Sequence, residues 1–172
     1  SSNLLLSEDV ISTLNCLKKL GVKVKITKSF CEIVGLGLNG FRYKKNLTLD
    51  AGNSGTLGRL ILGLLVHSKK KIKIKGDESL SKRDFLRVTR PLEEFGAKFN
   101  SNNGKLPIKI LGTNNSKPIR YNENKGSAQC KSAVMFAALN TSGETVIKAK
   151  KSRDHSELLF KHLKLPIKIY KR

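Results

Sequence analysis

The sequence contains no tryptophan, and Phe, Tyr and Trp together account for only 6% of its 172 residues. RNA-binding modules that read single strands stack bases on aromatic rings and carry recognisable aromatic motifs. No such motif occurs here, which argues against a domain of that kind. The mean hydropathy of −0.30 and the hydrophobic fraction of 38% are typical of one globular domain with its own core.

Cysteines are also few. Cys16, Cys31 and Cys130 are an odd number of thiols, widely spaced and outside any CxxC or Cys/His pattern. The sequence therefore predicts neither a disulfide framework nor a zinc site. It shows no ligand set for a metal and implies no organic cofactor.

Long apolar runs are absent as well. The longest, Leu60–Val66, is much shorter than the roughly 20 residues that a membrane-spanning helix needs. The segment Ser1–Asp9 lacks the basic start and apolar stretch of a secretory signal. We therefore expect a cytoplasmic protein that has no membrane partner.

Acidic residues are scarce: 13 Asp and Glu stand against 34 Lys and Arg, giving a net charge of +21. Such an excess attracts anions, and nucleic acid is the usual first candidate. Many of the lysines, however, alternate with apolar residues, as in Val22–Ile26 and Ile72–Lys75. This alternation is typical of strands with one solvated face. Charge alone leaves a functional and a merely compositional explanation open.

An internal repeat organises the chain. Leu17–Val24, Leu92–Phe99 and His162–Ile169 each read as the end of an amphipathic helix, a Gly or Pro stop, and a strand with exposed lysines. Gly21 and Gly96 mark this stop 75 residues apart. A repeat of this length is too long for a solenoid and suits three copies packed around a common centre.

The segments between these copies also match. Small residues at Gly52–Thr56 and at Gly126–Gln129 each open an apolar helix that is followed by a strand. We predict a single partial α/β (α+β) domain with unit boundaries at 1–48, 49–117 and 118–172. Only the middle unit is complete, so the chain is expected to be part of a larger protein.

The segment Gly35–Gly40 is a literal GxGxxG pattern. A dinucleotide-binding fingerprint requires a helix that opens on these glycines. The following Phe41–Leu49 is polar and strand-like, so a glycine-rich turn between strands is the better interpretation.

Two strand-to-helix junctions in the middle unit carry groups suited to anions. In Gly52–Arg59, Gly55 would let the backbone approach a phosphate or carboxylate at a helix N-terminus, and Asn53 and Thr56 could donate further hydrogen bonds. An ordinary helix cap explains the same residues equally well. In the second junction, Arg83 could bind a carboxylate or phosphate through two parallel hydrogen bonds. Its expected place in a first helical turn opposes the helix dipole, which suggests a further role.

Ser127–Gln129 and Ser152–His155 form the third and fourth junctions. In a repeat fold all four should lie on one side of the domain and form a binding face for an anionic substrate. His155 is equally explained as a surface or capping residue.

At these four junctions the sequence resembles the family of 5-enolpyruvylshikimate-3-phosphate synthases, in the family's order and at about its spacing. The resemblance runs from end to end of the chain and is carried by Leu49–Thr56, Gly76–Arg83, Ser127–Ala133 and Ser152–His155. It implies an inside-out α/β barrel of βαβαββ units, and a second domain of the same enzyme across the active-site cleft. The implied reaction moves the carboxyvinyl group of phosphoenolpyruvate onto the 5-hydroxyl of shikimate 3-phosphate, without metal or cofactor.

The resemblance also implies site residues. Gly55 and Arg83 would contact phosphoenolpyruvate, and His155 would lie close to the substrate. The expected ligands of shikimate 3-phosphate are Ser127, Ala128, Gln129, Ser152 and Arg153, with Gln129 near both substrates, and the expected positioning residues are Asn53, Thr56 and Arg59. The catalytic residues are expected in the second domain.

Several departures from the family pattern matter. Asp84 stands where the family usually has proline, and its carboxylate could compete with substrate for Arg83. Leu57–Gly58 and Cys130 also replace more usual residues. The family's early Lys-Ser…Arg motif has no counterpart, so we expect this chain alone to be inactive. Glycine at position 55 predicts that the parent enzyme is sensitive to glyphosate.

Three alternatives stay open at this stage. A basic nucleic-acid-binding domain would use the same charge, although we consider a nucleic-acid partner unlikely. Another enolpyruvyl transferase would act on a UDP-sugar. A truncated product without function is the third.

Overall fold

The computed structural model describes residues 2–27, 30–38 and 40–170. Helices and strands follow one another along the whole described chain. In order they are α1 (Glu8–Lys19), β1 (Lys23–Ile26), β2 (Cys31–Val34), β3 (Leu47–Asp50), α2 (Gly55–Leu64), β4 (Ile72–Lys75), α3 (Glu78–Ser81), α4 (Leu86–Glu94), β5 (Lys98–Asn102), β6 (Lys105–Leu111), β7 (Arg120–Glu123), α5 (Ala128–Ala138), β8 (Val146–Ala149) and α6 (His155–His162).

The strands form three separate sheets. β1 and β2 pair antiparallel, and β7 and β8 pair parallel. Between them in the sequence lies a four-stranded sheet of order β3-β4-β6-β5, in which β3 and β4 are parallel and the other pairs antiparallel. The parallel pairs β3-β4 and β7-β8 each enclose one helix, α2 and α5, as a βαβ connection requires.

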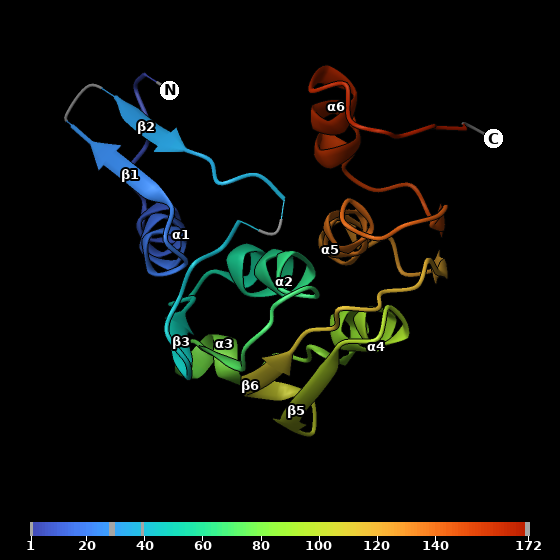
Figure 1. Ribbon diagram of the computed structural model, residues 1–172, viewed down its shortest axis with the longest axis horizontal. Coiled ribbons are helices and arrows are strands. Elements are labelled where there is room, and N and C mark those ends of the chain that lie inside the picture. The colour runs from blue at the N-terminus through green and yellow to red at the C-terminus, as the bar shows by residue number, and fades with distance from the viewer. Residues whose placement is uncertain (1, 28–29, 39, 171–172) are drawn as a thin grey trace.

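Two helices lie toward the middle of the molecule. Figure 1 shows α2 and α5 there, with the strands of the three sheets toward the outside. α2 and α5 approach very closely, since a Cβ on Gly63 would lie 2.1 Å from the carbonyl oxygen of Ala133. Only glycine permits this separation, because any side chain would overlap the facing backbone. The predicted inside-out α/β architecture is confirmed.

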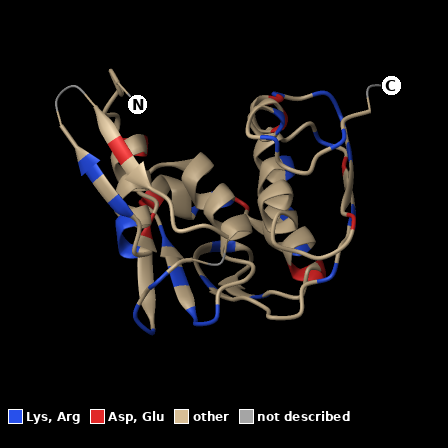
Figure 2. Cartoon of the chain, turned by 45° about the horizontal axis from the view of Figure 1, so that its top comes forward, with Lys and Arg blue, Asp and Glu red and all other residues tan. Residues whose placement is uncertain are grey.

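The core is continuous from the four-stranded sheet to these central helices. β4 and β6 direct Ile72, Ile74, Ile108 and Ile110 inward, and all four are at most 1% exposed. The alternate lysines of these strands face outward, and Figure 2 shows basic residues on strands and loops over several parts of the surface. The alternating lysines are therefore the solvated faces of one-sided strands, as the sequence pattern indicates.

Some local predictions were wrong. Ile167–Ile169 forms no strand among the described residues, although its alternation matches that of β1 and β4. The residues 41–46 before β3 are likewise irregular. In the glycine-rich segment 35–40, which lies between β2 and β3, Asn39 is outside the described residues and no helix begins at the others. The unit boundaries at 48 and 117 stay a prediction.

Candidate functional site

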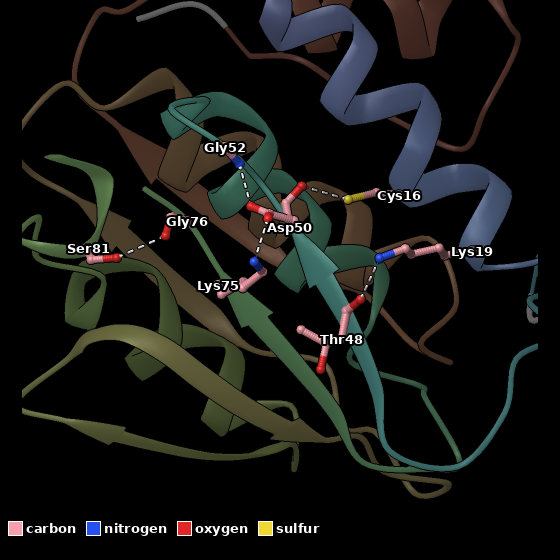
Figure 3. Close-up of polar contacts among 8 residues, drawn as sticks. All are labelled: Cys16, Lys19, Thr48, Asp50, Gly52, Lys75, Gly76 and Ser81. Carbon is pink, nitrogen blue, oxygen red and sulfur yellow. Dashed lines mark hydrogen bonds and ion pairs between the residues drawn. The ribbon is translucent and has the colours of Figure 1, made fainter. Parts of the chain in front are cut away.

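The turn after β3 is held from both sides. The Asp50 carboxylate accepts a hydrogen bond from the Gly52 amide at 2.9 Å and pairs with Lys75 of β4 at 2.7 Å. The thiol of Cys16 on α1 donates to the Asp50 carbonyl at 3.3 Å, as Figure 3 shows. The hydrogen bond from Lys75 is the main reason that the pKa of Asp50 lies below its ordinary value. The start of α2 is thereby fixed against its own sheet.

α2 begins with a capped, acid-free first turn. The Ser54 hydroxyl accepts a hydrogen bond from the Leu57 amide at 3.2 Å, and the next residues, Gly55 and Thr56, carry no charge. Amides in a first helical turn have no acceptor within the helix, and they favour an anion. The capping explanation of this motif is therefore correct, and it coexists with a surface suited to an anion.

Arg83 lies directly against this helix start. A Cβ on Gly55 would be 3.0 Å from an Nη atom of Arg83. Arg83 follows the C-cap of the one-turn helix α3, so the prediction that it stands in a first helical turn was wrong. Its charge therefore does not oppose the dipole of α3, and its exposed guanidinium points toward α2 instead.

Asp77 joins the two junctions of the middle unit. Its amide donates to the Gly52 carbonyl at 2.9 Å, and its carboxylate accepts hydrogen bonds from the Leu80 amide and the Asn53 side chain. These two bonds, the one from Leu80 first, hold the pKa of Asp77 below its ordinary value. Asn53 thus positions one loop against the other.

Asp84 forms its side-chain hydrogen bond with the start of α4 and not with Arg83. The Asp84 carboxylate accepts a hydrogen bond from the Leu86 amide at 2.7 Å, at the start of α4. A carboxylate at a helix N-terminus is favourable, because it meets free amides and the positive end of the dipole. Among the described residues no ion pair links Asp84 to Arg83. Competition of Asp84 with substrate for Arg83 stays a prediction.

Gln129 connects the start of α5 to the start of α2. Its side-chain amide donates to the Thr56 hydroxyl at 2.8 Å, and its carbonyl oxygen accepts from Arg59. The Arg59 guanidinium also lies 5.5 Å from the ring centroid of Phe85, a cation–π arrangement. The four residues fix the relative position of two helix starts that are about 70 residues apart in the sequence.

A buried carboxylate supports the loop before α5. Glu123, only 3% exposed, accepts hydrogen bonds from the amides of Ser127 at 2.8 Å and Lys125 at 3.2 Å, and lies 3.6 Å from Arg87. The Ser127 hydroxyl in turn accepts from the Cys130 amide and caps α5. Glu123 therefore sets the position of Ser127.

The fourth junction lies beside α5. The Arg153 carbonyl accepts a hydrogen bond from Lys131 at 3.1 Å, and the buried Ser152 hydroxyl has no hydrogen-bond partner among the described residues. His155 is exposed as the first residue of α6, and it is the neighbouring Ser156 that contacts α5.

The structure therefore links all four junctions through side-chain contacts. Six predicted residues belong to one connected group at the starts of α2, α3 and α5, and Ser127 and Ala128 directly precede Gln129. The Arg153 carbonyl is linked to α5 through Lys131, and the neighbouring Ser152 makes no side-chain hydrogen bond among the described residues. In the part of the chain that the structure describes, no hydrogen bond or ion pair joins His155 to the group. The connected six are Asn53, Gly55, Thr56, Arg59, Arg83 and Gln129.

Three supporting residues were missed from the sequence: Asp77, Glu123 and Lys131. Asp77 carries the usual signature of a cap, since it precedes the short helix α3. Lys131 is a cation in the first turn of a helix made mainly of small apolar residues. Both signals can be recognised in the sequence, but the residues with which Asp77 and Lys131 interact cannot be.

The described residues contain no cluster of three or more His, Cys, Asp or Glu side chains that could hold a metal ion. No described helix is long and apolar enough to cross a membrane. What the arrangement offers is hydrogen-bond donors, two guanidinium groups and helix N-termini, which together suit anionic ligands.

The fold and the linked junctions define a class: an inside-out α/β domain whose helix N-termini meet around arginine side chains. The family model described as EPSP synthase (3-phosphoshikimate 1-carboxyvinyltransferase) matches residues 2–172. The chain belongs to this family.

Curated relatives carry the same name. The 3-phosphoshikimate 1-carboxyvinyltransferase of Caldicellulosiruptor saccharolyticus is 44% identical over 162 residues, covering 92% of this chain and 37% of the relative. That of Ruthia magnifica is 48% identical over 162 residues, covering 93% and 37%. The chain thus spans a little over a third of the length of these relatives.

Solved structures agree with the sequence comparison. An EPSP synthase from Acinetobacter baumannii superposes with a TM-score of 0.88 at 32% identity, covering 99% of this chain and 39% of that one. The enolpyruvyl transferase NikO from Streptomyces tendae gives 0.58 at 15% identity, covering 90% of this chain and 35% of that one, which shows a shared fold only.

Proposed function

We propose that this chain forms one half of the active site of a 3-phosphoshikimate 1-carboxyvinyltransferase. The observation that carries the proposal is the contact of Gln129 with Thr56 and Arg59, beside the pair Gly55 and Arg83. It joins the groups assigned to two different substrates. Binding energy can be used for catalysis only when both substrates are held in a fixed relative geometry.

Arg83 and the start of α2 bind phosphoenolpyruvate in this proposal. A guanidinium gives two parallel hydrogen bonds to a carboxylate or phosphate, and the amides at Gly55 add donors of fixed direction. Asn53, Thr56 and Arg59 position this surface through their contacts with Asp77 and Gln129.

The second group binds shikimate 3-phosphate. It comprises the start of α5, from Ser127 to Gln129, and the loop carrying Ser152 and Arg153. The unpartnered hydroxyl of Ser152 supports this assignment, because a buried hydroxyl normally has a hydrogen-bond partner. His155 lies at the edge of this group.

In the proposed reaction the 5-hydroxyl of shikimate 3-phosphate loses its proton to a base as its oxygen forms a bond to C2 of phosphoenolpyruvate, and C3 takes up a proton from an acid. The tetrahedral adduct then loses a proton from C3 and its phosphate group, which restores the double bond. Both substrates are anions that repel each other, and the cationic surface stabilises their approach. We propose that a second domain of the same enzyme supplies the catalytic acid and base and encloses the substrates. The cytoplasmic location stays a prediction.

The test is a calorimetric titration of this chain with shikimate 3-phosphate at physiological salt, after circular dichroism has shown that the chain is folded. Shikimate and inorganic phosphate serve as ligand controls. We expect saturable binding that requires ring and phosphate together and that weakens about tenfold in Gln129→Leu, because two hydrogen bonds are lost. The matched amide variant Asn124→Leu, at an exposed position before α5, should bind normally. Equal binding of shikimate 3-phosphate and phosphate would overturn the assignment.

A further inference from the structure

Lys131 is an unusual residue for its position. It lies in the first turn of α5, where a cation opposes the helix dipole, and its side chain is only 9% exposed. Burial of a charge is unfavourable unless the charge is paired and hydrogen-bonded. The partners of Lys131 should therefore reveal what it does.

Both partners lie at the fourth junction. The Lys131 ammonium group donates to the Arg153 carbonyl at 3.1 Å and forms an ion pair with Glu157, whose side chain is 17% exposed. Glu157 is in the first turn of α6, where a carboxylate is favourable. Lys131 thus connects α5 simultaneously to the loop before α6 and to α6 itself.

A second contact runs alongside the first. The hydroxyls of Ser132 and Ser156 are 2.6 Å apart, again joining α5 to the start of α6. Residues 152–155 are therefore held at their end by Ser156 and in their middle by the Arg153 carbonyl. Ser152, at the beginning of this loop, has a buried hydroxyl that makes no hydrogen bond within the described part of the chain.

We infer that Lys131 and Glu157 are positioning residues for shikimate 3-phosphate: their ion pair holds the 152–155 loop so that Ser152 and Arg153 face the start of α5. The inference rests on the proposed function and adds to it two residues outside the predicted site. Lys131 acts through the loop rather than by touching the substrate, because its ammonium group is buried against Arg153 and Glu157.

A positioning role and a merely stabilising role for Lys131 predict different behaviour of the double variant. A buried ion pair contributes little net stability, so removing both charges restores much of the stability that is lost when one is removed. Removing both charges does not restore the hydrogen bond from Lys131 to the Arg153 carbonyl. Stability and loop position therefore separate in a double variant.

The experiment compares Lys131→Met, Lys131→Arg and the double variant Lys131→Met/Glu157→Gln with the unaltered chain. Lys148→Met, which removes an exposed lysine from β8, controls for net charge. Hydrogen–deuterium exchange is measured without ligand, and titration with shikimate 3-phosphate follows on the same samples.

We expect amides 152–157 to exchange about tenfold faster in Lys131→Met and in the double variant, while those at the start of α2 are unchanged. Affinity for shikimate 3-phosphate should fall about tenfold in both, and Lys131→Arg should recover most of it. Thermal stability should fall in Lys131→Met and should recover in the double variant, although loop exchange and affinity do not. Lys148→Met should behave like the unaltered chain.

Unchanged exchange of 152–157 in the double variant would overturn the inference, because the loop would then keep its place without the ion pair. Normal affinity in a double variant with a loosened loop would overturn it equally. If the unaltered chain binds no shikimate 3-phosphate, the proposed function fails, and the exchange measurement still decides whether Lys131 positions the loop.

Discussion

At the start of α2 the charged side chains are at the surface, whereas at the start of α5 they are buried beneath it. Arg83 is exposed and Arg59 is partly exposed, and the α2 turn itself is held by the Ser54 cap and the half-exposed Asp50–Lys75 ion pair. Around α5, Glu123 and Lys131 are both buried, and each hydrogen-bonds to backbone atoms of a loop.

This difference separates two uses of charge. An exposed guanidinium keeps its hydrogen-bond donors available for a ligand, and its removal changes the folded state little. A buried charge is committed to protein atoms, and its removal leaves the partners unsatisfied. The α2 side should therefore respond to substitution through binding, and the α5 side through stability and loop position.

The largest effect is expected at Arg83. Replacing it by alanine should weaken phosphoenolpyruvate binding about 100-fold, because a charge-assisted, two-point contact is lost. The free energy of unfolding should be nearly unchanged. Isothermal titration and chemical denaturation measure the two quantities.

Lys82→Ala is the matched control for this prediction. Lys82 is the neighbouring exposed cation and pairs with Glu78 one helical turn away. It should leave affinity within about twofold, since an exposed ion pair of this kind contributes little. Equal losses in the two variants would show that only net charge matters at this surface.

The next effect concerns Glu123. Glu123→Gln should lower the free energy of unfolding by about 2 kcal/mol. The glutamine amide has one acceptor oxygen, so it cannot accept hydrogen bonds on both sides from the Ser127 and Lys125 amides, and it carries no charge to pair with Arg87. Urea denaturation measures the loss. The exposed Glu144→Gln is the control, and a loss as large there would refute the contrast between buried and surface charge.

A smaller effect is expected at Gly55. In Gly55→Ala the new methyl group would lie 3.0 Å from the Arg83 guanidinium and displace it. Affinity for phosphoenolpyruvate and inhibition of the full enzyme by glyphosate should fall about tenfold, with stability retained. Gly35→Ala, which meets no atom within 4 Å, should have no effect on either.

The smallest effect concerns the far ends of the central helices. His67, just beyond α2, contacts the hydroxyls of Ser116 at 3.0 Å and Thr141 at 3.3 Å, and burial lowers its pKa below the ordinary 6.5. The unfolded chain therefore binds a proton at a higher pH than the folded chain does. Stability should decline as the pH falls below about 6.5.

Denaturation midpoints between pH 7.5 and 5 test this prediction. His67→Gln should remove part of the pH dependence, whereas His162→Gln, on an exposed residue of α6, should retain it. An identical pH profile in both variants would assign the dependence to other groups.

Local sequence signals predicted the helix starts well. Ser54 and Ser127 cap α2 and α5, and glycines with positive φ, Gly21 and Gly96, follow α1 and α4. These features depend on neighbouring residues only, which is why they can be read from sequence. The same signals misplaced Arg83, because the helix expected to contain it ends after a single turn at Ser81.

Signals that depend on distant partners were less reliable. The segment Ile167–Ile169 repeats the Lys-Ile alternation of β4, yet it forms no strand among the described residues. A strand needs a neighbour to satisfy its backbone, and alternation alone does not supply one. The paired strands β4 and β6 do have such neighbours.

The sequence by itself therefore located the helix starts at the junctions before α2 and α5, because caps and turns are short-range properties. The inside-out α/β class followed from the resemblance to a known family, and the unit boundaries and the roles of the site residues stay predictions. Only the tertiary structure decided that Gln129 meets Thr56 and Arg59, that Asn53 meets Asp77, and that Lys131 reaches Glu157. Such partners are chosen by how closely packed helices approach one another, and that distance is set by the whole core.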